Sequence, residues 1–347
     1  MRTFVTGLAL AVAALAVAGR AVVAQGTSVP YWAYGYLSAP KPGEAAPDCG
    51  VPLPVSCARP RAAAALDETP HSLPGAPKQY SRKQATEWFA PADWYPMDHP
   101  AMPPIVANGN EKTGVRACGL CHNPNGKGRP ENAQVAGLPM NYFIQQMAAF
   151  KAGDRKSADP WKLNSKEMAR MAATMTDAEI REAAQYFSSM KWTPFMKVVE
   201  TANPPAYTET IGGLFMPKEG EGHGTTMPLG NRIIEVPEDP HGTEAYRNPR
   251  AGFIAYVPPG SIAKGEALAT TGGNGKTLAC NICHGPDLMG LGDVPGIAGR
   301  SASYLVRQMH DMQQGTRKTA LMKSVVANLT EDDYIALGAY LASRPVK

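Results

Sequence analysis

Two short motifs in this 347-residue sequence share the pattern Cys-x-x-Cys-His. One spans residues 118–122 and the other spans residues 280–284. Two thiols three positions apart on one helical turn can each add to one vinyl group of a haem, and the adjoining histidine then lies under the iron as an axial ligand. A single copy would also fit a redox-active dithiol or half of a zinc site, but two copies that each end in histidine favour haem. The sequence therefore predicts two covalently attached haem c groups, held by Cys118, Cys121, His122, Cys280, Cys283 and His284.

An internal repeat surrounds the two motifs. Tyrosine, glutamine, methionine, glycine, arginine and lysine stand 5, 9, 10, 16, 18 and 19 residues after Gly137, and the same residue types stand at the same distances after Gly299. The first copy holds eight additional residues, in the stretch 157–166. Agreement at so many positions predicts two equivalent haem modules.

The repeat also selects a second axial ligand for each iron. Met168 lies eight residues before Thr176, and Met322 lies eight residues before Thr330, so these two methionines occupy corresponding positions. A methionine paired with a histidine is an established haem ligand set. We therefore expect Met168 and Met322 each to complete the coordination of an iron that the motif histidine already binds.

Other residues compete for these ligand positions. Met171 is the reserve candidate in the first module. His310 is the main competitor in the second module, where it would give bis-histidine ligation, but Ala148 stands at the matching place in the first module. Met147 and Met309 also correspond to each other, and we expect them to be core residues because methionine often fills gaps in hydrophobic cores.

Periodicity and capping patterns predict the helices that position these residues. Thr176 and Thr330 each begin a segment in which a threonine hydroxyl and a nearby carboxylate can satisfy open backbone N–H groups at a helix start. Ser261 is a candidate cap for a further helix. The spacing of apolar residues completes the assignment. Helices are expected over residues 141–150, 166–174, 176–190, 261–269, 303–313 and 330–343.

The first residues are typical of a secretory signal. Arg2 precedes a short apolar run at residues 8–18, and small residues follow up to Ala24. We expect cleavage before Gln25 and a periplasmic protein, which agrees with attachment of bacterial c-type haem outside the cytoplasmic membrane. The alternative is an uncleaved anchor, although the apolar run is shorter than a bilayer requires.

Residues 25–105 form a Pro-rich extension in which few regular elements are expected. The aromatic run at residues 31–36 is expected to pack across a haem domain, with docking of a partner as the alternative. Cys49 and Cys57 are expected to form a local disulfide in an oxidising compartment, with ligation of a haem by one of these thiolates as the alternative. One short helix is expected over residues 82–89.

Residues 196–259 form a connector rich in proline and glycine. A connector of this length seldom remains a free tether in a compact protein, so we expect it to lie on the haem domains. Strand-like runs at residues 232–236 and 253–257 predict a small hairpin. His223 and His241 are expected to be exposed loop residues.

The two haem-bearing segments resemble class I cytochromes c, and more closely the dihaem cytochrome c4-like family. The resemblance is clearest in the second copy, in Cys-x-x-Cys-His-Gly from Cys280, Pro-Gly-Ile-Ala-Gly-Arg-Ser-x-x-Tyr from Pro295, Gly-Thr-Arg from Gly315 and Asn-Leu-Thr-Glu-Asp-Asp from Asn328. It implies a mainly α fold with two tandem class I cytochrome c domains, joined here to a long Pro-rich N-terminal extension and a long Pro/Gly-rich connector. The expected organisation is a signal peptide at 1–24, the extension at 25–105, cytochrome c domain 1 at 106–195, the connector at 196–259 and cytochrome c domain 2 at 260–347.

The resemblance also implies a hydrogen bond from the ring of each motif histidine to a backbone carbonyl. Pro295 stands at this place in the second module. Ala133 has the equivalent spacing in the first module, where its own carbonyl or that of Pro130 could serve. Such a bond fixes the tautomer of the imidazole and raises its basicity as a ligand.

The function expected from these features is single-electron transfer. Two six-coordinate irons need no acid, base or nucleophile, and they suit exchange between a periplasmic donor, such as a dehydrogenase, and an acceptor, such as an oxidase or a small cytochrome. The alternatives are a dihaem redox enzyme, peroxidase-like or thiosulfate-oxidising, in which one iron can open a coordination site, and a structural or anchoring subunit of a larger complex. The scattered basic residues and net charge of +4 are not typical of nucleic-acid binding, and membrane association is expected only peripherally or through an uncleaved signal.

Overall fold

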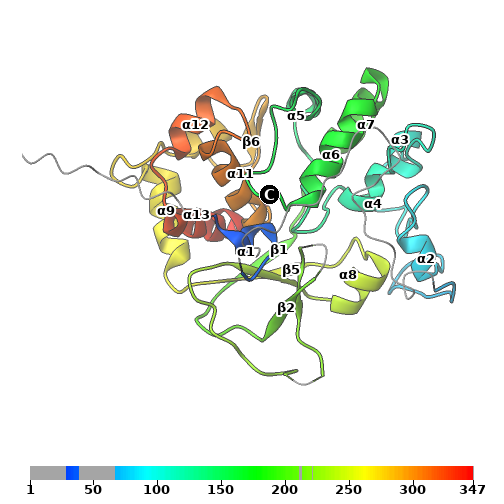
Figure 1. Cartoon of the computed structure of the whole chain (residues 1–347), viewed down its shortest axis with the longest axis horizontal. Helices are drawn as coiled ribbons and strands as arrows, with labels where there is room; N and C mark the ends of the chain where they lie inside the picture. Colours follow the sequence, from blue (N-terminus) through cyan, green and yellow to red (C-terminus); the bar gives the residue numbers. More distant parts are fainter. Residues whose placement is uncertain (1–28, 39–66, 211–212, 221, 347) are drawn as a thin grey trace, which may run out of the picture.

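A computed structural model describes residues 29–38, 67–210, 213–220 and 222–346 (Figure 1). The predicted signal peptide and the predicted Cys49–Cys57 disulfide lie outside the described residues. Among the helices of the described part, none combines the length and the apolar character needed to cross a membrane.

The first module, residues 106–195, is built from short helices around one apolar cluster. The order is α3 (Pro104–Ala107), α4 (Cys118–His122), α5 (Met140–Ala152), α6 (Leu163–Thr174) and α7 (Asp177–Ser188). Helices α5, α6 and α7 enclose Met147, Met171 and Phe187, and all three side chains are buried. Full burial of a side chain as large as that of Phe187 stabilises a fold by roughly 1.5–3 kcal/mol, so this cluster supports the helix that carries the first motif.

Local signals explain where these helices begin and end. The predicted capping box of α7 is present, because the Thr176 hydroxyl accepts from the Glu179 N–H at 3.2 Å and the Glu179 carboxylate accepts from the Thr176 N–H at 2.8 Å. Helix α5 ends at Gly153, whose φ of 74° is a conformation that glycine adopts without strain. Helix α6 begins three residues before the predicted start, after a turn in which Asp159 accepts from the Trp161 N–H at 3.0 Å.

The second module, residues 260–347, repeats this plan. It contains α9 (Ser261–Thr271), α10 (Asn281–His284), β6 (Gly290–Leu291), β7 (Val294–Pro295), α11 (Ala302–Gln313), α12 (Ala320–Val326) and α13 (Glu331–Ser343). Every residue of α13 from Asp333 to Ala342 is buried, which identifies this helix as the centre of the module. The predicted capping box at Thr330 is present, with Asp333 as its carboxylate.

Two details differ from the prediction for α9. Ser261 is the first residue of the helix and not its cap, because Gly260 takes the cap position in a left-handed conformation with a φ of 83°. Helix α9 also approaches α13 so closely that a Cβ on Gly265 would lie 2.0 Å from the carbonyl oxygen of Ala336. Only glycine at position 265 permits this contact between the two helices.

The connector contains more regular structure than the predicted hairpin. It holds β1 (Met196–Glu200), β2 (Tyr207–Glu209), β3 (Phe215–Pro217), β4 (Ile234–Pro237), α8 (Pro240–Tyr246) and β5 (Phe253–Val257). Strands β4 and β5 pair antiparallel as expected, but β1 adds to the other side of β5 in parallel orientation, and α8 intervenes between β4 and β5. His241 lies at the start of α8 and not in a loop, although it is exposed as predicted, and so is His223.

The connector packs on the haem modules, as the sequence predicts. The buried carboxylate of Glu235 in β4 accepts from the Ala302 N–H at 2.7 Å and from the Ser301 hydroxyl at 2.8 Å. These groups lie at the N-terminus of α11, where open N–H groups and the helix dipole favour a negative charge. Figure 1 shows the helices of the two modules on opposite sides of the molecule, with the connector strands below them.

The extension contacts both modules. Helix α1 (Tyr31–Tyr34) packs against α11, and its Trp32 and Tyr34 are buried, so the described part of the aromatic run packs on the second module as expected. Helix α2 spans Arg82–Ala85 and is shorter than the predicted helix over 82–89. Trp94 and Tyr95 form a small satellite core with α8 of the connector.

Candidate functional site

Both motif histidines are oriented by a backbone carbonyl. The Nδ1 atom of His122 lies 2.8 Å from the carbonyl oxygen of Ala133, and the Nδ1 atom of His284 lies 2.7 Å from that of Pro295. The expected hydrogen bond from His284 to the carbonyl of Pro295 is therefore confirmed. In the first module the acceptor is the carbonyl of Ala133 and not that of Pro130, the other candidate. With Nδ1 as the donor, Nε2 of each ring is left with the lone pair that a metal requires.

Burial keeps the motif side chains neutral. It lowers the pKa of both motif histidines, which favours the uncharged imidazole that binds iron. Burial also raises the pKa of Cys118 to about 12 and that of Cys280 to about 11. These are thiols in apolar surroundings, because Cys118 and Cys280 each pack against the core cluster of their own module.

The donor set of each motif suits a haem better than zinc. A structural zinc ion takes four protein ligands, usually cysteine and histidine. Within the described ranges no group of three or more Cys, His, Asp or Glu side chains gathers in a metal-binding arrangement, and the four described cysteines are free thiols. Two thiols and one oriented imidazole against an apolar cluster are the groups that a covalently bound haem requires.

The predicted methionine ligands lie in the clusters that contain the motifs. Met168 in α6 is half-buried in the cluster that includes Cys118, and Met322 in α12 is half-buried in the cluster that includes Cys280. Met171 lies one turn after Met168 and is buried in the same cluster. The placement brings each candidate to the correct module, and the choice between Met168 and Met171 stays a prediction.

His310 is held by the extension. Its Nδ1 atom lies 2.9 Å from the Tyr34 hydroxyl, which also donates to Asp311 at 2.6 Å. Burial lowers the pKa of His310 to about 4, so the ring is neutral at ordinary pH. This contact with Tyr34 gives His310 a role in the core of the second module that the sequence analysis did not foresee.

The residues that recur in the two copies meet at the interface between the modules. Arg155 donates to Tyr304 at 3.2 Å and to Gln308 at 3.1 Å, and the equivalent Arg317 donates to Tyr142 and to the glutamine equivalent to Gln308, both at 2.8 Å. This reciprocity defines an isologous contact with pseudo-twofold symmetry inside one chain. The sequence analysis found the repeat but did not predict that its tyrosines, glutamines and arginines meet. The equal spacing of these polar and basic residues was the available signal for an interface.

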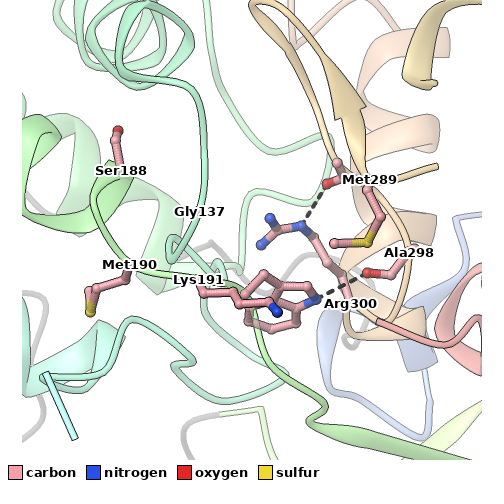
Figure 2. A pocket seen from close by; sticks show the side chains of 9 residues that line it. Gly137, Ser188, Met190, Lys191, Met289, Ala298 and Arg300 are labelled. Atoms are coloured by element: carbon pink, nitrogen blue, oxygen red, sulfur yellow. Dashed lines mark hydrogen bonds between the residues drawn. The ribbon is translucent and has the colours of Figure 1, made fainter. Parts of the chain in front are cut away.

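A cavity of about 240 Å³ lies between the modules next to this interface (Figure 2). Buried Arg300 from the second module donates to the carbonyl of Gln134 in the first module at 2.8 Å, and its guanidinium stacks over Trp192 at 4.5 Å. The Trp192 indole N–H in turn donates to the carbonyl of Ala298 at 3.1 Å. These contacts fix the segments that follow the two motifs relative to each other.

The two motifs differ in exposure. Leu120 of the first motif is 3% exposed, whereas Ile282 at the equivalent position of the second motif is 67% exposed. The extension covers the first motif through the carbonyl of Trp88, which accepts from the Ala117 N–H at 3.0 Å. The connector covers it through Arg247, which donates to the carbonyl of Leu120 at 2.9 Å. Ile282 and Cys283 of the second motif are therefore exposed, although His284 is buried, whereas no residue of the first motif is exposed.

Comparison with known proteins agrees with this geometry. Residues 106–191 match the family model for cytochrome c. The chain is 25% identical to cytochrome c4 of Stutzerimonas stutzeri over 237 residues, which cover 65% of this chain and 84% of that protein. It is also 35% identical over 102 residues to a thiosulfate dehydrogenase electron acceptor from the same species, covering 28% of this chain and 47% of that protein. Among solved structures, a thiosulfate dehydrogenase from Marichromatium purpuratum aligns with a TM-score of 0.46 and 25% identity over 70% of this chain and 39% of that one.

Residues 106–191 therefore have both the family match and the oriented Cys-x-x-Cys-His motif of a cytochrome c, and the second module repeats this motif geometry. The chain is similar to cytochromes c4 over about two thirds of its length. In the described part of the chain, the extension and the connector cover the first motif through Trp88 and Arg247.

Proposed function

We propose that this chain is a periplasmic dihaem cytochrome that passes single electrons between redox proteins through two His/Met-ligated haems. The observation that carries the proposal is the duplicated geometry of the motifs. In each module the first thiol of the motif, Cys118 or Cys280, packs against an apolar cluster, and an imidazole is oriented by a carbonyl 2.7–2.8 Å away. A bound haem c supplies an iron that changes its charge by one unit at low cost.

The residues that would hold the first haem are Cys118, Cys121 and His122, with Met168 as the sixth ligand. The residues that would hold the second are Cys280, Cys283 and His284, with Met322. Methionine as the sixth ligand leaves no open coordination site and raises the reduction potential relative to bis-histidine ligation. The protein's part is to orient the imidazoles, exclude water through the apolar clusters and fix the two modules through the reciprocal arginine contacts.

One relative supports the proposal for the class of partner. The relative from Stutzerimonas stutzeri that is 35% identical over 102 residues is a thiosulfate dehydrogenase electron acceptor. We therefore propose a periplasmic dehydrogenase as the class of electron donor. An oxidase or a small cytochrome is the proposed acceptor. The chain itself is proposed to carry electrons and not to catalyse a reaction, since the same closed His/Met ligand set is proposed for both modules.

Absorption spectroscopy of the ferric protein tests this proposal. The purified protein should contain two haems per chain and show the long-wavelength methionine–iron band with the intensity of two haems. Met168→Ala and Met322→Ala should each remove about half of the band. Met171→Ala and Met309→Ala are the matched controls, because they remove neighbouring buried methionines, and both should keep the full band.

Three results would contradict the proposal. One haem per chain would show that a motif is not loaded. High-spin iron in one module of the unmodified protein would show an open coordination site. Turnover of hydrogen peroxide or oxidation of thiosulfate by the purified chain alone would favour the dihaem enzyme.

A further inference from the structure

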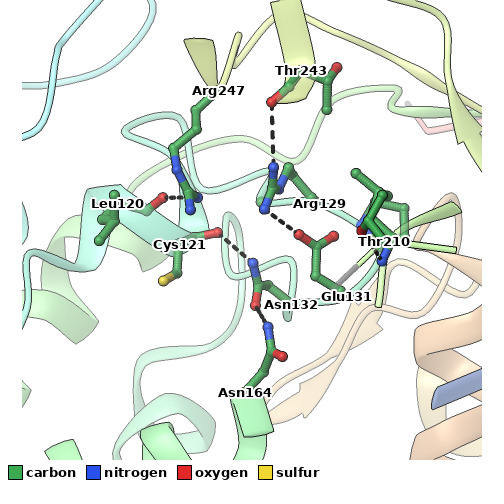
Figure 3. A network of polar contacts seen from close by, with 12 residues as sticks. Leu120, Cys121, Arg129, Glu131, Asn132, Asn164, Thr210, Thr243 and Arg247 are labelled. Atoms are coloured by element: carbon green, nitrogen blue, oxygen red, sulfur yellow. Dashed lines mark hydrogen bonds and ion pairs between the residues drawn. The ribbon is translucent and has the colours of Figure 1, made fainter. Parts of the chain in front are cut away.

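The connector places a positive charge against the first motif. The guanidinium of Arg247 donates to the carbonyl of Leu120, the residue directly before Cys121, at 2.9 Å (Figure 3). Arg247 ends α8 in a left-handed conformation with a φ of 51°, which is uncommon for a residue other than glycine. An unfavourable backbone conformation persists where surrounding contacts over-determine it, so the position of this side chain is well fixed.

The charges around Arg247 do not cancel. Arg129 forms an ion pair with the buried carboxylate of Glu131 at 2.5 Å and donates to the carbonyl of Thr243 at 3.4 Å. Two guanidinium groups therefore face one buried carboxylate beside Cys121. The other carboxylate near Arg247, that of Glu244, is exposed, so water screens its charge and it offsets the buried positive charge only weakly. The Nε atom of Arg247 is buried and has no hydrogen-bond partner, so its charge is incompletely neutralised by the protein. Burial lowers the pKa of Arg247 only to about 10, and the group stays charged at neutral pH.

The second motif has a different environment. Ile282 takes the place of Leu120 and faces solvent, and Leu278, two residues before the motif, is also exposed. Leu278 corresponds to Arg116 of the first module, whose guanidinium stacks over Trp88 at 3.9 Å. Water around the second motif therefore screens charge, whereas the first motif lies in a region of lower effective dielectric.

We propose that Arg247 raises the reduction potential of the first haem above that of the second. An oxidised haem iron carries one more positive charge than a reduced one, so a fixed positive charge nearby favours the reduced state. A unit charge roughly 10 Å from an iron changes a one-electron equilibrium about tenfold at an effective dielectric constant near 20. The burial of the first motif acts in the same direction, because low polarity disfavours the more highly charged state.

The consequence is a direction for electron flow within the chain. With both haems bound, one electron would leave the iron of the second module, taking it from Fe²⁺ to Fe³⁺, and would reduce the iron of the first module from Fe³⁺ to Fe²⁺. Neither a proton nor a co-reactant is needed. This inference rests on the proposed function, because both motifs must carry haem.

Spectroelectrochemical titration of the dihaem protein tests the inference. Two midpoints are expected, and the higher one belongs to the first haem; Met322→Ala assigns them because it moves only the midpoint of the second haem. Arg247→Gln removes the charge but keeps a hydrogen-bond donor, and it should lower the first midpoint by the equivalent of about tenfold in the equilibrium between the haems, which is about 59 mV for one electron. Arg247→Lys keeps the charge and should retain most of the unmodified midpoint.

A second variant is expected to shift the midpoint in the opposite direction, so the inference can still be tested if Arg247→Gln does not fold. Glu131→Gln removes the carboxylate of the same network, and it should raise the first midpoint and leave the second unchanged. The matched control in the second module is Lys323→Gln, next to Met322, whose exposed charge is screened and whose removal should move neither midpoint appreciably.

The outcomes separate this inference from the proposed function. Two haems per chain with a first midpoint that neither Arg247→Gln nor Glu131→Gln moves would overturn the inference and leave electron transfer intact. Equal shifts of both midpoints, or a lower midpoint for the first haem, would also overturn it. One haem per chain in the unmodified protein would overturn the proposed function itself.

Discussion

The two haem modules share one framework and differ in what covers it. Both hold an oriented histidine, an apolar cluster and the same interface residues at the same spacing. Trp88 of the extension and Arg247 of the connector close over the first motif, while Ile282 of the second motif faces solvent. The repeated sequence therefore builds the two sites, and the segments outside the repeat make them unequal.

The exposed apolar residues emphasise this contrast. Within the described part of the chain, four of the six exposed large hydrophobic side chains belong to the second module: Leu278, Ile282, Leu291 and Leu321. Thr277 joins this region to α12, since its hydroxyl donates to the carbonyl of Val325 at 2.6 Å. Isolated apolar side chains on a surface are common, but their number in the second module sets it apart from the first module.

The largest expected effect compares the same position in the two motifs. Leu120→Ala should lower the free energy of unfolding by about 3 kcal/mol, because it opens a cavity beneath the cover of the first motif. Ile282→Ala should change it by less than about 0.5 kcal/mol, because the side chain is exposed. Chemical denaturation of the haem-loaded protein measures both. Equal losses would show that the cover over the first motif does not exist in solution.

A second prediction concerns the part of the acid sensitivity that comes from His310, which only the second module contains. The pKa of His310 is about 4 in the fold and about 6.5 when unfolded, so between these values the unfolded chain binds more protons and stability falls as the pH falls. Lowering the pH from 6.5 to 5 should cost about 1.5 kcal/mol. The first module has Ala148 at this position and lacks this contribution.

Urea unfolding at the two pH values, with His310→Gln as the comparison, isolates this effect. Asp311 lies beside His310, and burial raises its pKa, but it is present in both proteins and its contribution cancels. The variant should lose less stability on acidification than the unmodified protein. An unchanged pH dependence would assign the acid sensitivity to other groups.

The smallest expected effect lies where the pseudo-twofold symmetry is broken. Lys318 forms an ion pair with Asp154 at 2.6 Å, whereas the equivalent of Asp154 in the second module is Thr316, so Lys156 has no matching carboxylate there. Both charged side chains are well exposed, and Lys318→Ala should cost no more than about 0.5 kcal/mol. Lys156→Ala is the control, and thermal unfolding at low and high salt measures the difference. A large loss of stability with Lys318→Ala and not with Lys156→Ala would show that this ion pair is a principal contact between the modules.

Local sequence signals predicted much of the fold. The capping boxes at Thr176 and Thr330 and the strands β4 and β5 depend on neighbouring residues and were found in the expected places. Strand β1 was missed because only its parallel pairing with distant β5 defines it, and three of its five side chains are exposed. Helix α8 was missed because Pro240 and Gly242 lie within it, and a cap from Asp239 together with packing on the extension holds it.

The candidate site was predictable to the extent that it is repeated. The motifs, the carbonyl of Pro295 and the correspondence of Met168 with Met322 follow from spacing, although the two methionine ligands stay predictions. The role of Arg247 could not be predicted, because it arises from a contact between residues 127 positions apart, in a segment outside the repeat. The contact between Tyr34 and His310 could not be predicted for the same reason, because the two residues are 276 positions apart.

Helix α1 has a consequence for how the second module forms. The Trp32 indole donates to Glu331 at 3.0 Å across 299 positions of the chain, and Tyr34 fills the space beside α11. Contacts of such high sequence separation slow folding, because a long loop must close before they contribute. The core of the second module is therefore complete only after α1, which precedes the first module in the sequence, has packed against it. A fragment limited to residues 260–346 would lack these side chains of its core.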